Sequence, residues 1–245
     1  MITSVKNETI KQWNKLKKKK NREQTNQFLI EGNHLVEEVL KSDWPIEAII
    51  VQENIDIPFD TRDCNIVIVS NNVMEHLTDT KAPQGIMAVV NRAEVQLTSN
   101  HRLLLLDSIQ DPGNVGAMIR TADAAGFSGV ILGENTVDLF NDKVIRSTQG
   151  SIFHLPIIQA NLEEMCKNLK KEAVSIWAST LDRANAINEL TVPDKVALIV
   201  GNEGAGVSTT LIEQADKRVH IPIYGQAESL NVSVATGIMV YQMVL

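Results

Sequence analysis

The chain has 245 residues, of which 44% are hydrophobic and 22% are charged, a composition typical of soluble globular proteins. No apolar run approaches the ~20 residues that a membrane-spanning helix needs, and the N-terminus has no segment of signal-peptide type, so we expect a cytoplasmic protein. The net charge of −7 argues by itself against a nucleic-acid partner, and Cys64 and Cys166, which form no C-x-x-C pattern, are expected to be reduced thiols.

Positive charge is concentrated in the first 22 residues, which hold seven Lys and one Arg against a single Glu. Ile10, Trp13 and Leu16 have helical spacing, which predicts a helix that packs by one face and exposes lysines on the other. One interpretation of the lysine run is a solvated tail. The pattern also suits an arm that contacts nucleic-acid phosphates. The candidate contacts are Lys15, Lys17, Lys18, Lys19, Lys20 and Arg22.

Short strands and helices alternate after this basic helix. The strands are expected at 27–32, 47–52, 65–70 and 85–90, and the helices at 33–42 and 71–78. These elements can form a small α/β domain over residues 1–92. The polar stretch 93–101 is expected to be a linker.

Longer elements alternate in the same way over residues 102–245. Strands are expected at 102–109, 129–133, 174–180, 195–201 and 218–223, and helices at about 114–125, 141–148, 161–171, 208–215 and 229–244. The strands are continuous runs of Val, Ile and Leu, which predicts an α/β domain with a parallel sheet covered by helices on both faces.

Three loops of this second domain each follow a strand and precede a helix: "DPGNVG" from 111, "GNEGAGVS" from 201 and "YGQAESLN" from 224. Loops at the C-terminal ends of parallel strands gather around a ligand, so all three could form one site. The spacing of a dinucleotide-binding loop, a P-loop and a nucleophile elbow is absent, and the five histidines are scattered.

The stretches "DPGNVGAMIRTADAAGF", "LIVGNEGAGVS" and "IPIYGQAESLNVSVATGIMVYQ" resemble, in order, the three motifs of the SpoU/TrmH branch of the SPOUT RNA methyltransferases. The resemblance is strong over 102–245, and residues 1–92 are similar to the small RNA-binding domain of the family. It implies S-adenosylmethionine-dependent transfer to a ribose 2′-hydroxyl without a metal. It also implies a parallel sheet with a deep trefoil knot and a homodimer packed through the knot.

The resemblance assigns roles to residues whose structural alternatives stay open. Arg120 would activate or orient the hydroxyl. Because the pKa of free arginine is above ~12, its side chain is protonated at neutral pH, and the residue that accepts the proton of the hydroxyl is undecided. Asn114 could hold the arginine or the ribose, or simply cap a helix, and Glu203 could fix Arg120 or be a solvated loop charge. Ser229 and Asn231 would lie at the ribose. The cofactor is expected around Gly201, Asn202, Gly204, Ile221, Ile223, Ser229 and Leu230.

The expected substrate is 23S rRNA, because the N-terminal domain resembles that of rRNA-directed relatives. A tRNA methyltransferase is the first alternative. A non-catalytic RNA-binding protein of the same fold is disfavoured by the intact motifs, and a nucleotide-dependent enzyme without RNA is disfavoured by the missing phosphate loops.

Overall fold

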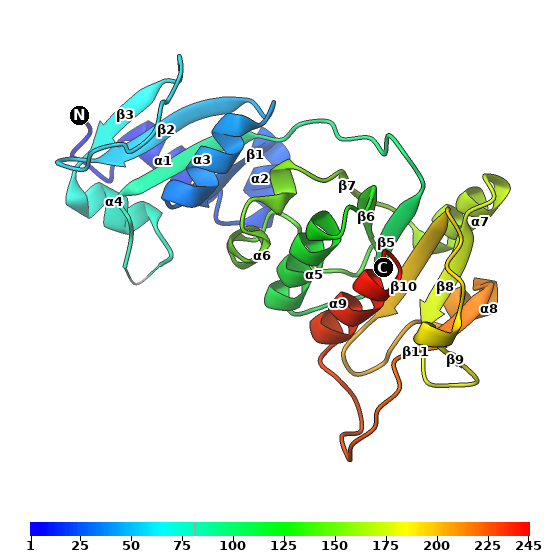
Figure 1. The fold of residues 1–245 in the computed structure, drawn as a ribbon. Helices are drawn as coiled ribbons and strands as arrows, with labels where there is room; N and C mark the ends of the chain where they lie inside the picture. Colours follow the sequence, from blue (N-terminus) through cyan, green and yellow to red (C-terminus); the bar gives the residue numbers. More distant parts are fainter. Residues whose placement is uncertain (81) are drawn as a thin grey trace. The chain divides into compact units, whose positions relative to one another are not determined.

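The computed structural model describes residues 1–80 and 82–245, which form two compact units (Figure 1). Unit 1 contains Met1–Glu94 and Asp138–Phe153, and unit 2 contains Val95–Val137 and His154–Leu245. Residues 138–153, expected within the domain 102–245, therefore pack with the N-terminal unit instead. No helix in the described part of the chain has the length and hydrophobicity to cross a membrane.

Unit 1 is built on a four-stranded sheet in the order β1-β4-β2-β3, in which β4 is antiparallel to both neighbours and β2 is parallel to β3. Its strands are β1 (Gln27–Glu31), β2 (Ile46–Gln52), β3 (Ile66–Val69) and β4 (Ile86–Asn91). Its first four helices are α1 (Glu8–Lys15), α2 (Lys19–Thr25), α3 (Asn33–Lys41) and α4 (Asn71–Leu77). One face of the sheet packs on α1 and α4 through a core that includes Ile10, Trp13 and Met74.

The basic N-terminal segment forms two helices rather than one. The predicted apolar stripe is confirmed, because Ile10, Trp13 and Leu16 are all buried. Leu16 already lies in the turn between α1 and α2, where it packs into the same core. Burial of this residue holds the turn against the sheet, so the lysines that follow are divided between a turn and the start of α2.

Residues 138–153 pack within unit 1 partly through aromatic contacts. They contain α6 (Asp142–Thr148) and the 3-10 helix η1 (Ser151–Phe153). The rings of Phe140 and Phe28 lie 4.7 Å apart, and those of Phe153 and Trp44 lie 5.6 Å apart. The hydrophobic pattern of α6 predicts that it is a helix, but not which sheet it covers.

Unit 2 is built on a seven-stranded sheet in the order β7-β6-β5-β10-β8-β11-β9, and every neighbouring pair is parallel. The strands are β5 (Arg102–Asp107), β6 (Gly129–Leu132), β7 (Ile157–Gln159), β8 (Ser175–Ser179), β9 (Asn185–Ala186), β10 (Val196–Gly201) and β11 (Lys217–His220). The helices are α5 (Pro112–Ala124), α7 (Leu162–Lys171), α8 (Thr209–Gln214) and α9 (Val232–Gln242), with the 3-10 helix η2 (Ile187–Glu189). The predicted parallel α/β domain is confirmed, and the short edge strands β7 and β9 are additional to it.

The segment after β11 differs from the expectation. The predicted strand 218–223 ends at His220, and residues 221–231 have no regular structure. The last helix begins at Val232, because the side chain of Asn231 accepts hydrogen bonds from the backbone N–H groups of Ser233 and Val234 and so caps it. The knot implied by the resemblance is not tested by strand order and stays a prediction.

Candidate active site

A cleft of about 650 Å³ lies where the carboxyl ends of β8, β10 and β11 meet, as expected for a ligand site on a parallel sheet. Its walls come from the segment after each of these strands and from the start of α9. All the residues expected to bind the cofactor line it: Gly201, Asn202, Gly204, Ile221, Ile223, Ser229 and Leu230.

The loop after β10 is shaped by Asn202. Its side-chain Oδ1 accepts hydrogen bonds from the backbone N–H groups of Gly204 (2.9 Å) and Ala205 (3.1 Å), and its Nδ2 donates to the carbonyl of Ser108 (2.9 Å). A Cβ atom at Gly201 would overlap the backbone of Gly206 and the next residue. Gly201 thus lets the loop fold back over the end of its own strand, which is the turn-geometry alternative for this glycine.

The three motif loops meet through one chain of hydrogen bonds. The Nδ2 of Asn114 donates to Oε1 of Glu203 at 3.0 Å, and the Nδ2 of Asn231 donates to Oδ1 of Asn114 at 3.3 Å. The backbone N–H of Asn114 donates to the side chain of Asp111, so Asp111 caps α5 and the alternative of Asn114 as the helix cap is wrong. The Asn114 side chain is therefore available to connect the loops.

The carboxyl of Glu203 is held in its ionised form. Desolvation by burial alone would raise its pKa, but the hydrogen bond from the Asn114 side chain lowers it, together with backbone N–H donors of Glu203, Asp111 and Gln110. The net effect is a pKa below the ordinary value of 4.5. Glu203 is thus an anionic acceptor near neutral pH that orients the amide of Asn114.

Arg120 and Ser229 lie outside this chain of hydrogen bonds. Arg120 follows Asn114 by six residues on α5, and because a helical turn takes 3.6 residues, the two side chains leave different sides of the helix. Arg120 is exposed, does not line the cleft, and makes no hydrogen bond or ion pair with the residues that the structure describes. Ser229 is exposed on the cleft wall.

The sequence analysis missed the part of the cleft wall that follows β8. Residues 179–182 and His220 line the cleft, and the Nδ1 atom of His220 is buried without a hydrogen-bond partner in the described ranges. One signal could have found residues 179–182. They lie at the carboxyl end of a predicted strand of the parallel sheet, and this end must lie at the same edge as the other loops.

The cleft fits S-adenosylmethionine in size and chemistry. Its volume lies within the range of 300–1,000 Å³ that is usual for clefts that bury drug-sized ligands. Its lining combines apolar residues such as Ile221 and Leu230 with the glycine loop that follows β10. Among residues 1–80 and 82–245, no group of His, Cys, Asp and Glu could hold a metal ion.

The six basic candidates of the N-terminal segment are not equivalent. Lys15, Lys18, Lys19 and Lys20 are exposed. Lys17 donates to the carbonyls of His76 and Thr78 and pairs with Asp79 at 3.0 Å.

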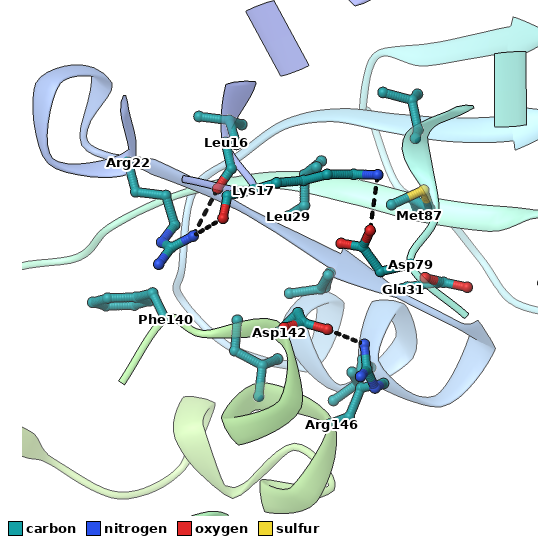
Figure 2. Close-up of a pocket in the computed structure, with 14 residues that line it drawn as sticks. Leu16, Lys17, Arg22, Leu29, Glu31, Asp79, Met87, Phe140, Asp142 and Arg146 are labelled. Carbon is teal, nitrogen blue, oxygen red and sulfur yellow. Dashed lines mark hydrogen bonds and ion pairs between the residues drawn. The ribbon is translucent and has the colours of Figure 1, made fainter. Parts of the chain in front are cut away.

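Arg22 does not fit the expectation that it contacts RNA. It is only 5% exposed, and its Nη1 donates to the carbonyls of Leu16 and Lys17, both at 2.9 Å (Figure 2). Its Nη2 pairs with Asp138. These contacts fix the α1–α2 turn and the 138–153 segment, so Arg22 has an internal role in place of the RNA contact expected from its position in the charge run.

Comparison with known proteins gives two family matches that follow one another along the chain. The model of the SpoU rRNA Methylase family matches residues 101–241, and that of the MRM3-like substrate binding domain matches residues 7–88. The chain is 46% identical to the 23S rRNA (guanosine(2553)-2′-O)-methyltransferase RlmP of Bacillus subtilis, over 99% of this chain and 98% of the relative.

Solved structures agree over nearly the whole length. An AdoMet-bound rRNA methyltransferase from Sinorhizobium meliloti is 32% identical with a TM-score of 0.87, covering 99% of this chain and 96% of that one. A TrmH-family RNA methyltransferase structure from Porphyromonas gingivalis is 27% identical with a TM-score of 0.89, covering 98% of both chains.

Proposed function

Because the chain belongs to the SpoU rRNA methylase family, we propose that the cleft holds S-adenosylmethionine and that the hydrogen-bonded loops beside it position a ribose of 23S rRNA. The protein is an S-adenosylmethionine-dependent RNA 2′-O-methyltransferase. The guanosine named for the Bacillus subtilis relative is the first nucleotide to examine. We also place the enzyme in the cytoplasm, together with its proposed rRNA substrate.

Different parts of the cleft wall are suited to bind the polar and the apolar parts of the cofactor. S-adenosylmethionine, when bound, supplies a methyl group on a sulfonium that a ribose oxygen can displace in line. Backbone groups around Gly204 and the irregular segment 221–231 are suited to hold its polar parts, while Ile221 and Leu230 cover its apolar surface. A group held by backbone atoms does not depend on a single side chain, so one substitution there should have a small effect.

The network of Asn114, Glu203 and Asn231 is the observation that carries the proposal. These side chains come from three motifs far apart in sequence, yet they are joined at 3.0–3.3 Å, and Glu203 and Asn231 line the cleft. Their hydrogen bonds restrict the rotamers of both asparagines, as a site that must orient a hydroxyl requires. The exposed guanidinium of Arg120 is then available to the ribose or a neighbouring phosphate.

The substrate is tested by methyl transfer to purified RNA. The protein is incubated with labelled S-adenosylmethionine and with transcripts of 23S rRNA or tRNA, and the 2′-O-methyl groups are mapped. Label on one ribose of the 23S transcript supports the proposal, whereas label confined to tRNA would assign the enzyme to the alternative substrate. Glu203→Gln should transfer more slowly to the same ribose.

The outer side of α9 supports a homodimer. Val234, Ile238, Tyr241 and Leu245 follow one another at helical spacing and are 51%, 44%, 43% and 98% exposed. The opposite side of α9 is already used, because Thr236 is buried and its Oγ1 donates to the sulfur of Met118 on α5 at 3.2 Å. A helix that is apolar on both sides needs a second partner, and we assign that role to another copy of the chain.

A further inference from the structure

Unit 1 contains a groove of about 510 Å³ that methyl transfer does not use. It lies alongside α1, next to the N-terminal ends of β1, β2 and β3. Its polar lining consists of Thr9, Gln12, Thr25, Gln27, Glu47 and Asn65.

The groove offers unused hydrogen-bonding groups over an apolar floor. Gln12, Glu47 and Asn65 are exposed, and their side chains make no hydrogen bond or ion pair with the described residues. Each amide supplies a donor and an acceptor, and the carboxylate supplies acceptors. Trp13 and Leu16 form apolar floor that is almost fully buried. Apolar surface flanked by polar groups suits a flat heterocycle with polar edges.

A second cavity of unit 1, shown in Figure 2, has the opposite character. Its volume is about 40 Å³, too small for a nucleobase. Several of its charges are already paired, as Lys17 is with Asp79 and Arg146 is with Asp142 at 2.6 Å. It therefore has little left to offer a ligand, and recognition by unit 1 is better served by the groove alongside α1.

The position of the groove connects it to RNA. Its six polar residues all lie within the match to the substrate binding domain, residues 7–88. The α1–α2 segment that supplies Leu16 and Thr25 to the groove also carries Lys15, Lys18 and Lys20, which are exposed and have no ion pair with the described residues. Phosphates held by these lysines would bring the bases of the same strand to the groove.

We propose that this groove binds one unpaired nucleobase of the substrate RNA through Gln12, Asn65 and Glu47. The inference rests on the proposed function, since it requires an RNA substrate. Sequence-specific RNA recognition commonly uses single-stranded bases whose edges are hydrogen-bonded by side chains. Because the Glu47 carboxylate only accepts hydrogen bonds, it favours a base edge with adjacent N–H donors, such as the N1 and N2 positions of guanine.

The test compares the double variant Gln12→Ala/Asn65→Ala with Gln24→Ala, which removes an exposed amide on α2 outside the groove. Affinity of the full-length protein for a 23S rRNA transcript is measured over a range of salt concentrations. The double variant should bind about tenfold more weakly at every salt concentration, because it loses neutral base contacts. Its S-adenosylmethionine affinity and its kcat at saturating RNA should match the wild type.

A triple variant, Lys15→Ala/Lys18→Ala/Lys20→Ala, supplies the contrast, since loss of phosphate contacts should flatten the salt dependence. Thr9→Trp, which places an indole in the groove, should weaken RNA binding without changing that slope. Equal RNA affinities for the double variant and Gln24→Ala would overturn the groove proposal. A flatter salt dependence of RNA affinity in the double variant would also overturn it, as would a change in the sedimenting mass of that variant. Absence of methyl transfer to rRNA by the wild type would instead overturn the proposed function.

Discussion

Arg120 stands apart from the cleft in which the cofactor is expected to bind. Arg120→Ala should therefore lower methyl transfer by about 10²–10³-fold, the usual effect of losing one preorganised electrostatic contact, and leave S-adenosylmethionine affinity largely intact. Single-turnover transfer and calorimetric titration of the cofactor measure the two effects separately. Arg183→Ala, which removes another exposed arginine of unit 2, is the control.

Two further results bear on Arg120. Arg120→Lys keeps the charge without the planar fork, so an active lysine variant would show that charge alone is sufficient. An alanine variant that transfers at the wild-type rate would contradict the assignment, and one that no longer binds the cofactor would show a structural role.

Glu203 has a pKa below its ordinary value of 4.5, which makes its contribution to stability depend on pH. A carboxyl with a lowered pKa in the folded state stabilises the protein fully above its unfolded pKa, and this stabilisation is lost as pH falls through the folded pKa. The difference in free energy of unfolding between wild type and Glu203→Gln should be constant from pH 7 to about 5 and change below 4.5. Denaturant titrations across this range measure it, and a difference that stays constant down to pH 3 would contradict the assigned network.

At the level of elements, α9 joins the cleft to the expected dimer interface. Ile238→Asp places a charge in the middle of its exposed apolar stripe, which should convert the dimer to monomer at micromolar concentration because a buried, unpaired charge is costly. Sedimentation velocity measures the change. Asn168→Asp makes a similar change in charge at an exposed position of α7 and should leave the dimer intact. A wild-type protein that sediments as a monomer would refute the interface.

The strands and helices also show which parts of the fold could be predicted from the sequence. The strands β5, β6 and β10 could be predicted from their apolar runs, which are rich in Val, Ile and Leu, and the resemblance to the family motifs indicated the cleft-lining residues. Side-chain partners could not be predicted. Arg22 belongs to the lysine run in sequence, but the run does not reveal its partners, which include Asp138 more than a hundred residues later. The role of Asn114 is equally ambiguous in the sequence, and it is the capping of α5 by Asp111 that excludes Asn114 as the helix cap.

On the scale of the whole molecule, the 138–153 segment limits how the chain can be cut into fragments that fold. A fragment of residues 95–245 would keep this segment but lose the partners of its aromatic rings, Phe28 and Trp44. Exposure of Phe140 and Phe153 together with α6 should make the fragment bind hydrophobic dyes and melt at lower temperature than the full chain. Dye fluorescence and calorimetry measure this. A fragment that binds no dye would show that the segment finds cover within unit 2.

Removal of residues 1–22, which charge alone would suggest as a test of the lysines, is unsuitable for a related reason. The deletion would also remove Ile10, Trp13 and Leu16 from the core of unit 1. Loss of RNA affinity would then report unfolding as well as lost phosphate contacts. The exposed lysines have to be replaced by point substitutions, as in the triple variant, while α1 is kept.

The attachment of residues 138–153 to unit 1 also sets an order on biosynthesis. A nascent chain that has reached Glu94 contains all four strands of the first sheet, yet the surface that Phe140 and Phe153 cover is still bare. β5, β6 and α5 must leave the ribosome before that surface can be closed. The leading domain of a chain usually folds first. Here the N-terminal unit can complete its folding only after residues 138–153 have been translated.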